Sequence, residues 1–119
     1  MNDDYKNALR AIGVDVDTAI GRVVGKEDLY EKLLLMFFDD KSLETLRAKI
    51  SEGNVQGAFD AAHTIKGTAG NLGLDNINEV VMPMVEILRA GSGEGVAEMV
   101  EQTQAKYDEL KAVIDKYAG

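Results

Sequence analysis

The sequence AAHTIKGTAGNLG at residues 61–73 decides the fold, because its apolar residues recur at helical spacing. It lies in a predicted helix that runs from Val55 to about Leu72, with Asn54 as its cap. On a helical wheel of about 100° per residue, one arc holds only small or apolar side chains. These are Ala58, Ala61, Ala62, Ile65, Ala69 and Leu72. We expect this arc to pack against a core.

His63, the only histidine in the 119-residue chain, lies on the opposite side of the wheel. A helix packed against a core turns this side to water, so we expect the imidazole to be exposed. Asp60 is the nearest acid, and we interpret it as solvated surface. The residues around His63 on this face are Gln56, Phe59, Asp60, Lys66, Gly67 and Gly70.

Gly67 and Gly70 follow His63 on the same face, one and two turns further along the helix. A glycine inside a helix costs roughly 1 kcal/mol relative to alanine, so stability does not explain them. A surface without Cβ atoms lets another body approach the imidazole closely, which predicts a large partner. Lys66 is within reach of the same point, and its mobile ammonium can hold an anion. This combination suits reversible attachment of a phosphoryl group, because histidine is an effective covalent nucleophile.

Each of these residues also has a plainer interpretation. A single helical histidine is more often an ordinary surface or core residue, and Lys66 is then an ordinary solvated lysine. Gly67 and Gly70 would mark close packing between helices inside the protein. The wheel disfavours this last interpretation, because both glycines point away from the apolar arc.

The run AAHTIKG at residues 61–67, followed by Gly70, Asn71 and Gly73, resembles the motif of the histidine-containing phosphotransfer (HPt) domain family. The resemblance covers nearly the whole chain. It implies a phosphocarrier in a histidine–aspartate phosphorelay of two-component signalling, not an enzyme. The partner would be a response-regulator receiver domain, with a hybrid sensor histidine kinase as a further candidate. The receiver would contribute the aspartate and the bound Mg²⁺, so no cofactor is expected on this chain.

The resemblance also implies roles for individual residues. His63 would be the phosphoacceptor, through Nε2 of its ring. Lys66 and Arg89 are the candidates for stabilising the phosphate. A neighbouring helix would orient the ring through its other nitrogen, and Glu79 and Glu86 are both open candidates for that role. The residues expected to contact the partner are Phe59, Gly67 and Gly70.

Two other functions remain open at this point. The chain could be an HPt-like module that binds a receiver or a kinase without accepting phosphate, although such a module needs neither His63 nor Lys66. It could also be a helical structural domain of a larger assembly, in which His63 has no role. The sequence identifies neither the cognate kinase and regulator nor the signal.

Composition excludes several classes. A net charge of −8 argues against nucleic-acid binding, which needs clustered lysine and arginine. The apolar run at residues 33–38 is far shorter than the about 20 residues of a membrane span, and the acidic start of the chain is unlike a signal peptide. There is no cysteine, and His63 has no set of acids around it, so we expect no metal site. We expect one domain over residues 1–119, monomeric and cytoplasmic.

The rest of the chain has the same helical periodicity and no strand signals, so we expect an all-α fold. Two short N-terminal helices, at about 3–11 and 16–23, would form a lid. Pro83 should interrupt its helix, with a kink near residues 79–82. The lid would cover an antiparallel four-helix bundle formed by residues 26–53, 55–73, 75–90 and 94–117.

Local signals give the caps and the buried faces. The predicted N-caps are Asp15, Ser42, Asn54 and Asp75. The apolar face of the helix from Lys26 consists of Leu29, Leu33, Leu34, Met36 and Phe37. The apolar face of the last helix consists of Val96, Met99, Val100, Thr103, Tyr107, Leu110 and Ile114.

Overall fold

The computed structural model describes residues 1–118, and these residues form helices joined by short turns, without a strand. The predicted all-α fold is confirmed. The helices are α1 (Asp3–Ala11), α2 (Val16–Arg22), α3 (Glu27–Phe37), α4 (Ser42–Ser51), α5 (Val55–Asn71), α6 (Asp75–Arg89) and α7 (Val96–Tyr117).

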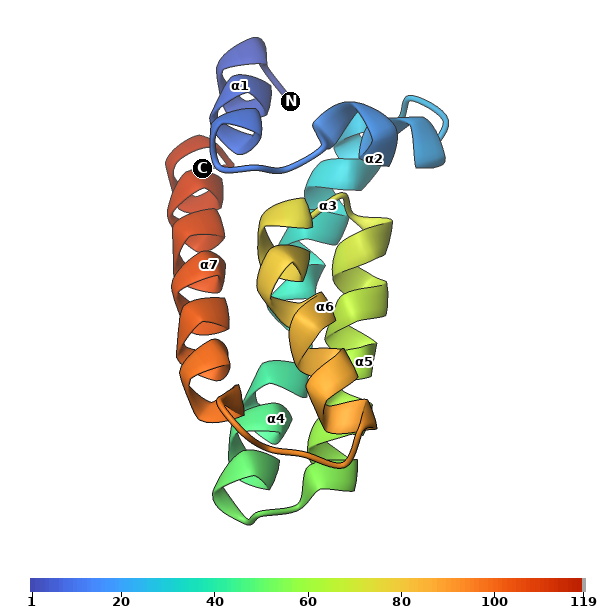
Figure 1. Cartoon of the computed structure of the whole chain (residues 1–119). Helices are drawn as coiled ribbons and strands as arrows, with labels where there is room; N and C mark the ends of the chain where they lie inside the picture. Colours follow the sequence, from blue (N-terminus) through green and yellow to red (C-terminus); the bar gives the residue numbers. More distant parts are fainter. Residues whose placement is uncertain (119) are drawn as a thin grey trace.

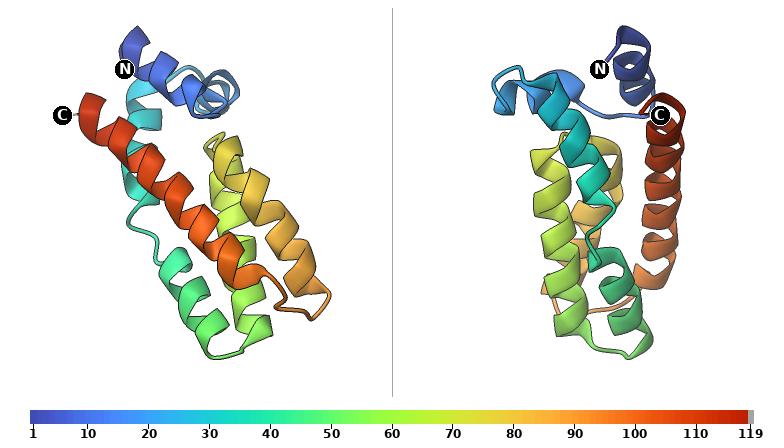
Figure 2. Two further views of the ribbon diagram at one scale, coloured as in Figure 1. Left: turned by 60° about the vertical axis from the view of Figure 1, so that its left-hand side comes forward. Right: turned by 180° about the vertical axis from the view of Figure 1, so that it is seen from behind.

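The predicted antiparallel bundle is also confirmed (Figure 1). Its first leg is divided into α3 and α4, and α5, α6 and α7 form the other three legs. α5 packs against α4 on one side and α6 on the other, while α7 closes the bundle against α6 and α4. The two further views in Figure 2 show α1 and α2 across the end of the bundle at which α7 terminates. α1 contacts α7, as expected of a lid.

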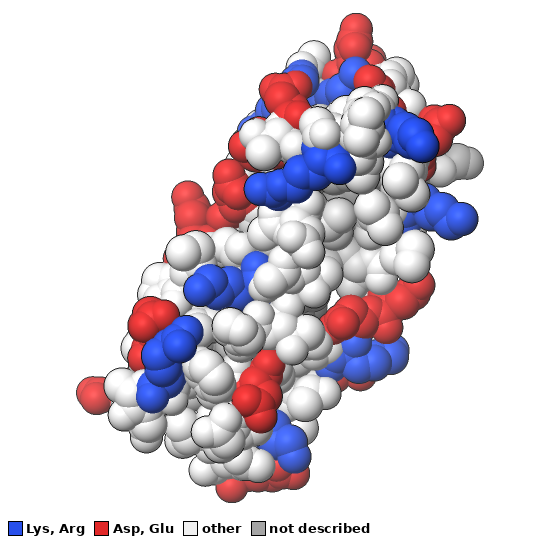
Figure 3. All heavy atoms as spheres, turned by 90° about the vertical axis from the view of Figure 1, so that its right-hand side faces the viewer, with Lys and Arg blue, Asp and Glu red and all other residues white. Residues whose placement is uncertain are grey.

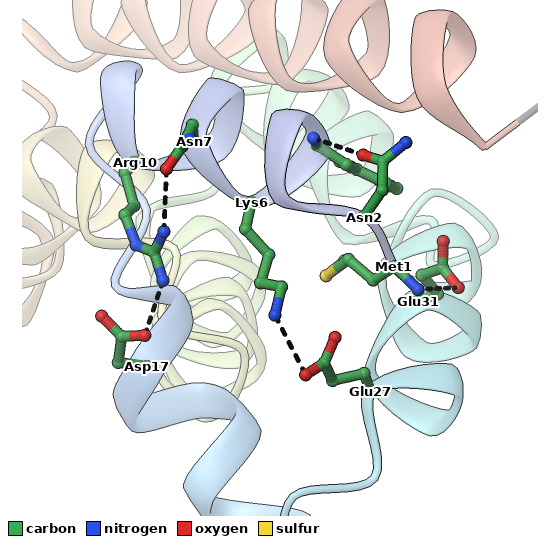
Figure 4. A network of polar contacts seen from close by, with 9 residues as sticks. Met1, Asn2, Lys6, Asn7, Arg10, Asp17, Glu27 and Glu31 are labelled. Carbon is green, nitrogen blue, oxygen red and sulfur yellow. Dashed lines mark hydrogen bonds and ion pairs between the residues drawn. The ribbon is translucent and has the colours of Figure 1, made fainter.

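Polar contacts join α1 both to the bundle and to α2, the other helix of the lid (Figure 4). The Lys6 ammonium lies 3.0 Å from the Glu27 carboxylate, and this contact joins α1 to α3. Arg10 lies 2.7 Å from Asp17, which joins α1 to α2. Exposed pairs of this kind contribute about 0–1 kcal/mol each, so they orient α1 more than they stabilise it. Burial contributes more, because Tyr5 and Leu9 of α1 belong to the core.

The core-facing side of α5 follows the helical wheel. Ala58, Ala61, Ala62, Ile65 and Ala69 are buried, and Leu72 is buried directly after the helix. Four of these five helical residues are alanines, so α5 contributes mainly methyl groups to its contacts with α4 and α6. The expected face of α7 is buried too, apart from the half-buried Met99.

The predicted apolar face of α3 is partly wrong. Leu29 and Met36 are 40% and 51% exposed, whereas the aromatic ring of Tyr30 is fully buried. The Tyr30 hydroxyl donates a hydrogen bond of 2.7 Å to the carbonyl oxygen of Leu72. α3 packs less closely against its neighbouring helices than α5 does, so these neighbours cover only part of its wide apolar stripe.

Two of the four predicted caps are confirmed. The Asp15 carboxylate accepts a hydrogen bond from the backbone N–H of Thr18, and the Asn54 side chain accepts one from Gly57. Hydrogen bonding to Thr18, through its side chain first and its backbone N–H second, lowers the pKa of Asp15.

Ser42 and Asp75 are not caps, because each is the first residue inside its helix. The Asp40 carboxylate instead accepts a bond of 2.7 Å from the backbone N–H of Ser42. Asp75 lies in the first turn of α6, where its negative charge favours the positive end of the helix dipole. Both errors displace the helix start by one residue.

α6 runs from Asp75 to Arg89 without interruption, so Pro83 does not divide the helix. Pro83 is exposed, on the side of α6 away from the core. A bend near residues 79–82 stays a prediction. α7 begins at Val96, two residues later than expected, after Gly95 in a left-handed conformation (φ 74°).

The turn after α5 is fixed by a close approach of two backbones. Gly73 has φ +70°, and a Cβ atom there would collide with the carbonyl oxygen of Asp15. The backbone N–H of Asp15 donates a bond of 2.8 Å to the carbonyl oxygen of Gly73. Glycine is therefore required at this position, and the contact attaches the start of α2 to the end of α5.

Candidate functional site

His63 projects from the outer face of α5 and is exposed, as the wheel predicts. It lies in the middle of the helix, between the Asn54 cap and the Gly73 turn, so a rigid element holds its backbone. Within residues 1–118 no hydrogen bond or ion pair holds the imidazole. Both ring nitrogens are therefore open to a reaction partner, and the backbone that carries them is fixed.

Two side chains lie beside the imidazole in a row. The ring of Phe59, one turn earlier on α5, stacks on the His63 ring with centroids 5.6 Å apart and planes 20° apart. The guanidinium carbon of Arg89 lies 5.2 Å from the centre of the Phe59 ring. Arg89 comes from the last turn of α6, so the bundle brings together residues that are far apart in sequence.

Lys66 follows His63 by three residues and is half-buried. Its carbonyl oxygen accepts a bond of 3.1 Å from the Asn78 side chain of α6. In the part of the chain that the structure describes, its ammonium makes no ion pair. The charge of Lys66 is thus free to meet an anion brought to His63.

The glycine face has no packing explanation inside the protein. Among the residues that the structure describes, a Cβ atom at Gly67 would meet nothing within 4 Å, and one at Gly70 would touch only Asn78, at an ordinary 3.6 Å. At Gly57, by contrast, an added Cβ atom would lie 2.8 Å from the Cδ atom of the Lys49 side chain. The interpretation of Gly67 and Gly70 as sites of close helix packing is therefore wrong.

The acids near the site are engaged elsewhere or solvated. Glu86 lies 3.5 Å from Arg89, and both Glu86 and Glu79 are exposed without a hydrogen bond to His63. Asp60 is exposed and accepts a bond from Gln56, which fits its interpretation as surface. In the described residues, Phe59 rather than an acid is therefore in contact with the ring.

Sequence reasoning missed two features at the far end of this face. Arg22 of α2 donates a hydrogen bond to the carbonyl oxygen of Gly70. A hollow of about 350 Å³ lies between α3 and α5, lined by Leu33, Met36, Phe37, Asp40, Thr68, Asn71 and Leu72. Both features depend on packing between distant segments, so no local pattern could have revealed them.

Figure 3 shows the molecule from the side on which α5 lies in Figure 1. A band without charged side chains crosses this face, with both basic and acidic side chains along its borders. The chain has a net charge of −8, so its acidic surface as a whole repels anions. An uncharged band repels an acidic partner less than the rest of the surface does.

The model of the Hpt domain matches residues 32–113, which is more than half of the chain. The chain belongs to the Hpt domain family. No curated protein and no solved structure matches it. The matched residues extend from α3 into α7 and include all of α5, with its exposed histidine.

Hpt domains are phosphocarriers of two-component signalling, and they interact with receiver domains and kinases. Among the described residues, no helix is long and apolar enough to cross a membrane. No group of three or more His, Asp or Glu in that part of the chain is placed to hold a metal ion.

Proposed function

We propose that this Hpt domain carries phosphoryl groups in a histidine–aspartate phosphorelay, accepting them from and donating them to receiver-domain aspartates at His63. The observation that carries the proposal is the exposed imidazole on a rigid helix, next to Gly67 and Gly70. Packing among the described residues does not require glycine at either of these two positions. A binding-only module gains no support from this arrangement, because it needs no open imidazole.

The transfer step uses the lone pair of Nε2 in the neutral imidazole. The N–P bond forms while the P–O bond to the receiver aspartate breaks, and the aspartate leaves as a carboxylate. The proton on Nδ1 stays on the ring. Every step runs backwards when the carrier donates the phosphoryl group to a second receiver, so one site serves both directions.

Positive charge near His63 would stabilise the phosphorylated state. A phosphoryl group adds a charge of about −1.5 to −2 on the values for hydroxyl phosphoesters. Lys66 is one turn away, and within residues 1–118 its ammonium makes no ion pair, while Arg89 reaches the Phe59 ring next to His63. We assign phosphate stabilisation to Lys66 first and to Arg89 second, because Arg89 also pairs with Glu86.

The partner would supply the charge neutralisation that phosphoryl transfer needs, namely an acidic site with Mg²⁺. We infer that a receiver domain docks over Gly67 and Gly70, with Phe59 at the border of the contact. The apolar hollow beside Thr68 and Asn71 extends this surface toward α3. A response-regulator receiver and a hybrid kinase are both suitable partners.

Residues 1–119 would act as one domain, although the family match begins at residue 32. Tyr5 and Leu9 of α1 and Val16 and Ala19 of α2 belong to the same hydrophobic core as α5 and α7. Separating these helices from the bundle would expose that apolar surface.

Incubation with a phosphorylated receiver domain tests the proposal. We expect phosphate on the carrier that is labile in acid and stable in base, and none on the His63→Gln variant. The variant should lose less than about 0.5 kcal/mol of unfolding free energy, because the side chain is exposed. Binding without phosphate would indicate the binding-only module, and neither binding nor phosphate a structural domain.

A further inference from the structure

The orientation of the His63 ring has a physical source other than a hydrogen bond. An exposed histidine rotates about two side-chain torsions, and in the described residues no acceptor or donor fixes either nitrogen. The Phe59 ring lies nearly parallel to the imidazole, at a centroid distance of 5.6 Å. This distance is within the roughly 4.5–7 Å range of favourable aromatic pairs.

Phe59 is itself held in place. It is half-buried and packs against the hydrophobic core, so its ring has less freedom than a surface side chain. The Arg89 guanidinium lies over the same ring, and Glu86 lies 3.5 Å from that guanidinium. A contact path thus leads from the core and α6 through Phe59 to His63.

We propose that Phe59 is the positioning residue of the phosphoacceptor, and that it sets the plane of the His63 ring by stacking. This inference rests on the proposed function. Phe59 does not touch the phosphoryl group in this account. It keeps the imidazole in one orientation before the partner docks, so that less motional freedom is lost when Nε2 meets the phosphorus atom. The acidic residues Glu79 and Glu86 then have no orienting role.

The path through Arg89 gives this residue a second task. By covering the Phe59 ring, Arg89 limits the movement of the ring that stacks on His63. Part of the effect of an Arg89 substitution should therefore pass through Phe59. In a double-mutant cycle, Phe59→Leu and Arg89→Ala should cost less together than the sum of their separate effects.

Phe59→Leu and Phe59→Tyr test the proposal directly. Leucine keeps an apolar side chain at the site but removes the flat ring, and tyrosine keeps the ring. With a phosphorylated receiver, we expect Phe59→Leu to lower the maximal transfer rate by roughly two- to tenfold, as expected for the loss of one aromatic pair. Because Phe59 lies only at the border of the proposed docking contact, the receiver concentration at half-maximal rate should change less than the maximal rate, and Phe59→Tyr should restore the maximal rate.

A nuclear magnetic resonance measurement on the free protein gives a second readout. The ring protons of His63 should carry a ring-current shift from Phe59, which Phe59→Leu removes and Phe59→Tyr retains. Phe38→Leu is the matched control, because Phe38 is a half-buried phenylalanine that contacts Phe37 and Tyr107 and not His63. It should lower stability without changing the His63 shift or the maximal rate.

The outcomes separate this inference from the proposed function. If the wild type accepts no phosphate, the function fails, and the His63 shifts still decide whether the stack exists. If the wild type accepts phosphate and Phe59→Leu transfers at the same maximal rate, Phe59 does not position the ring. A change confined to the half-saturating receiver concentration would overturn the inference too, because it would make Phe59 a docking residue only.

Discussion

Tyr30 of α3 and Leu72, just after α5, are joined by a buried hydrogen bond although 42 residues separate them in sequence. The tyrosine hydroxyl donates to the carbonyl oxygen of Leu72 at 2.7 Å. This bond holds the C-terminal end of the helix that carries His63 against the first leg of the bundle. Burial raises the pKa of Tyr30, because the ionised phenolate is poorly solvated there.

Tyr30→Phe should therefore destabilise the domain while keeping the aromatic ring in the core. The Leu72 carbonyl oxygen loses its buried partner, which costs about 1–3 kcal/mol of unfolding free energy. Equilibrium unfolding in denaturant would measure this loss as a lower midpoint concentration. The dependence of the unfolding free energy on denaturant concentration should be the same as in the wild type. An unchanged free energy of unfolding would show that water reaches the Leu72 carbonyl oxygen.

Alkaline pH should destabilise the domain through its buried tyrosines. Burial, and then the negative charge of Glu31, raise the pKa of Tyr5 from 10.0 to about 12. Because the pKa is higher in the folded state, the stabilisation is fully present below pH 10 and is lost as the pH rises toward about 12. A pH titration checks this prediction: absorbance reports the ionisation of the tyrosines, and circular dichroism reports the loss of helical structure. Tyr5→Phe should weaken the decline, and an equally steep decline would assign it to other groups.

Gly67→Gln should block phosphotransfer and leave the fold intact. Among the described residues, a Cβ atom at residue 67 would meet nothing within 4 Å, and glutamine exceeds glycine in helix propensity by roughly 0.5–1 kcal/mol, so stability should rise. Transfer from a phosphorylated receiver should fall because the side chain obstructs docking. Ala105→Gln, which adds similar bulk to an exposed residue of α7, is the control and should transfer normally. Undiminished transfer by Gly67→Gln would place the docking surface elsewhere.

Lys66→Ala should slow transfer or shorten the lifetime of the phosphorylated state by roughly two- to fivefold, the effect of one partly exposed ion pair of about 0.5–1 kcal/mol. Lys66→Arg should restore part of the loss, because its planar fork meets the anion in another geometry. Added salt should bring the wild type toward the alanine variant. Lys106→Ala makes the same charge change on α7 and should have no effect on transfer. Equal behaviour of Lys66→Ala and wild type at low salt would leave Lys66 a solvated lysine.

The sequence predicted α5 well because its information is local. Alanines at helical spacing placed the core on one side and His63 on the other, and the glycines were visible as a cost without a packing benefit. The position of Arg89 near the histidine face was an expectation from the family resemblance. The structure places its guanidinium on Phe59 rather than on His63 itself.

The remaining features depend on distances between segments or on backbone angles. The contact of Arg22 with Gly70 spans 48 residues, and the exposure of Leu29 depends on how loosely α3 packs against its neighbouring helices. Ser42 was mistaken for a cap because the helix begins one residue earlier than the residue types indicate: Lys41 occupies the cap position, and the Asp40 carboxylate accepts the bond from the Ser42 N–H. The residue types alone therefore do not predict these contacts, this exposure or the first residue of α4.

The alanine-lined face of α5 limits how the molecule can respond to its own modification. Alanine has no side-chain rotamers, so most of the α5 side of this seam cannot repack in response to a new charge at His63. The two forms of the carrier should therefore share one backbone. A partner would then recognise the loaded state directly, by the added charge and volume on the surface, and would receive no signal relayed through the bundle.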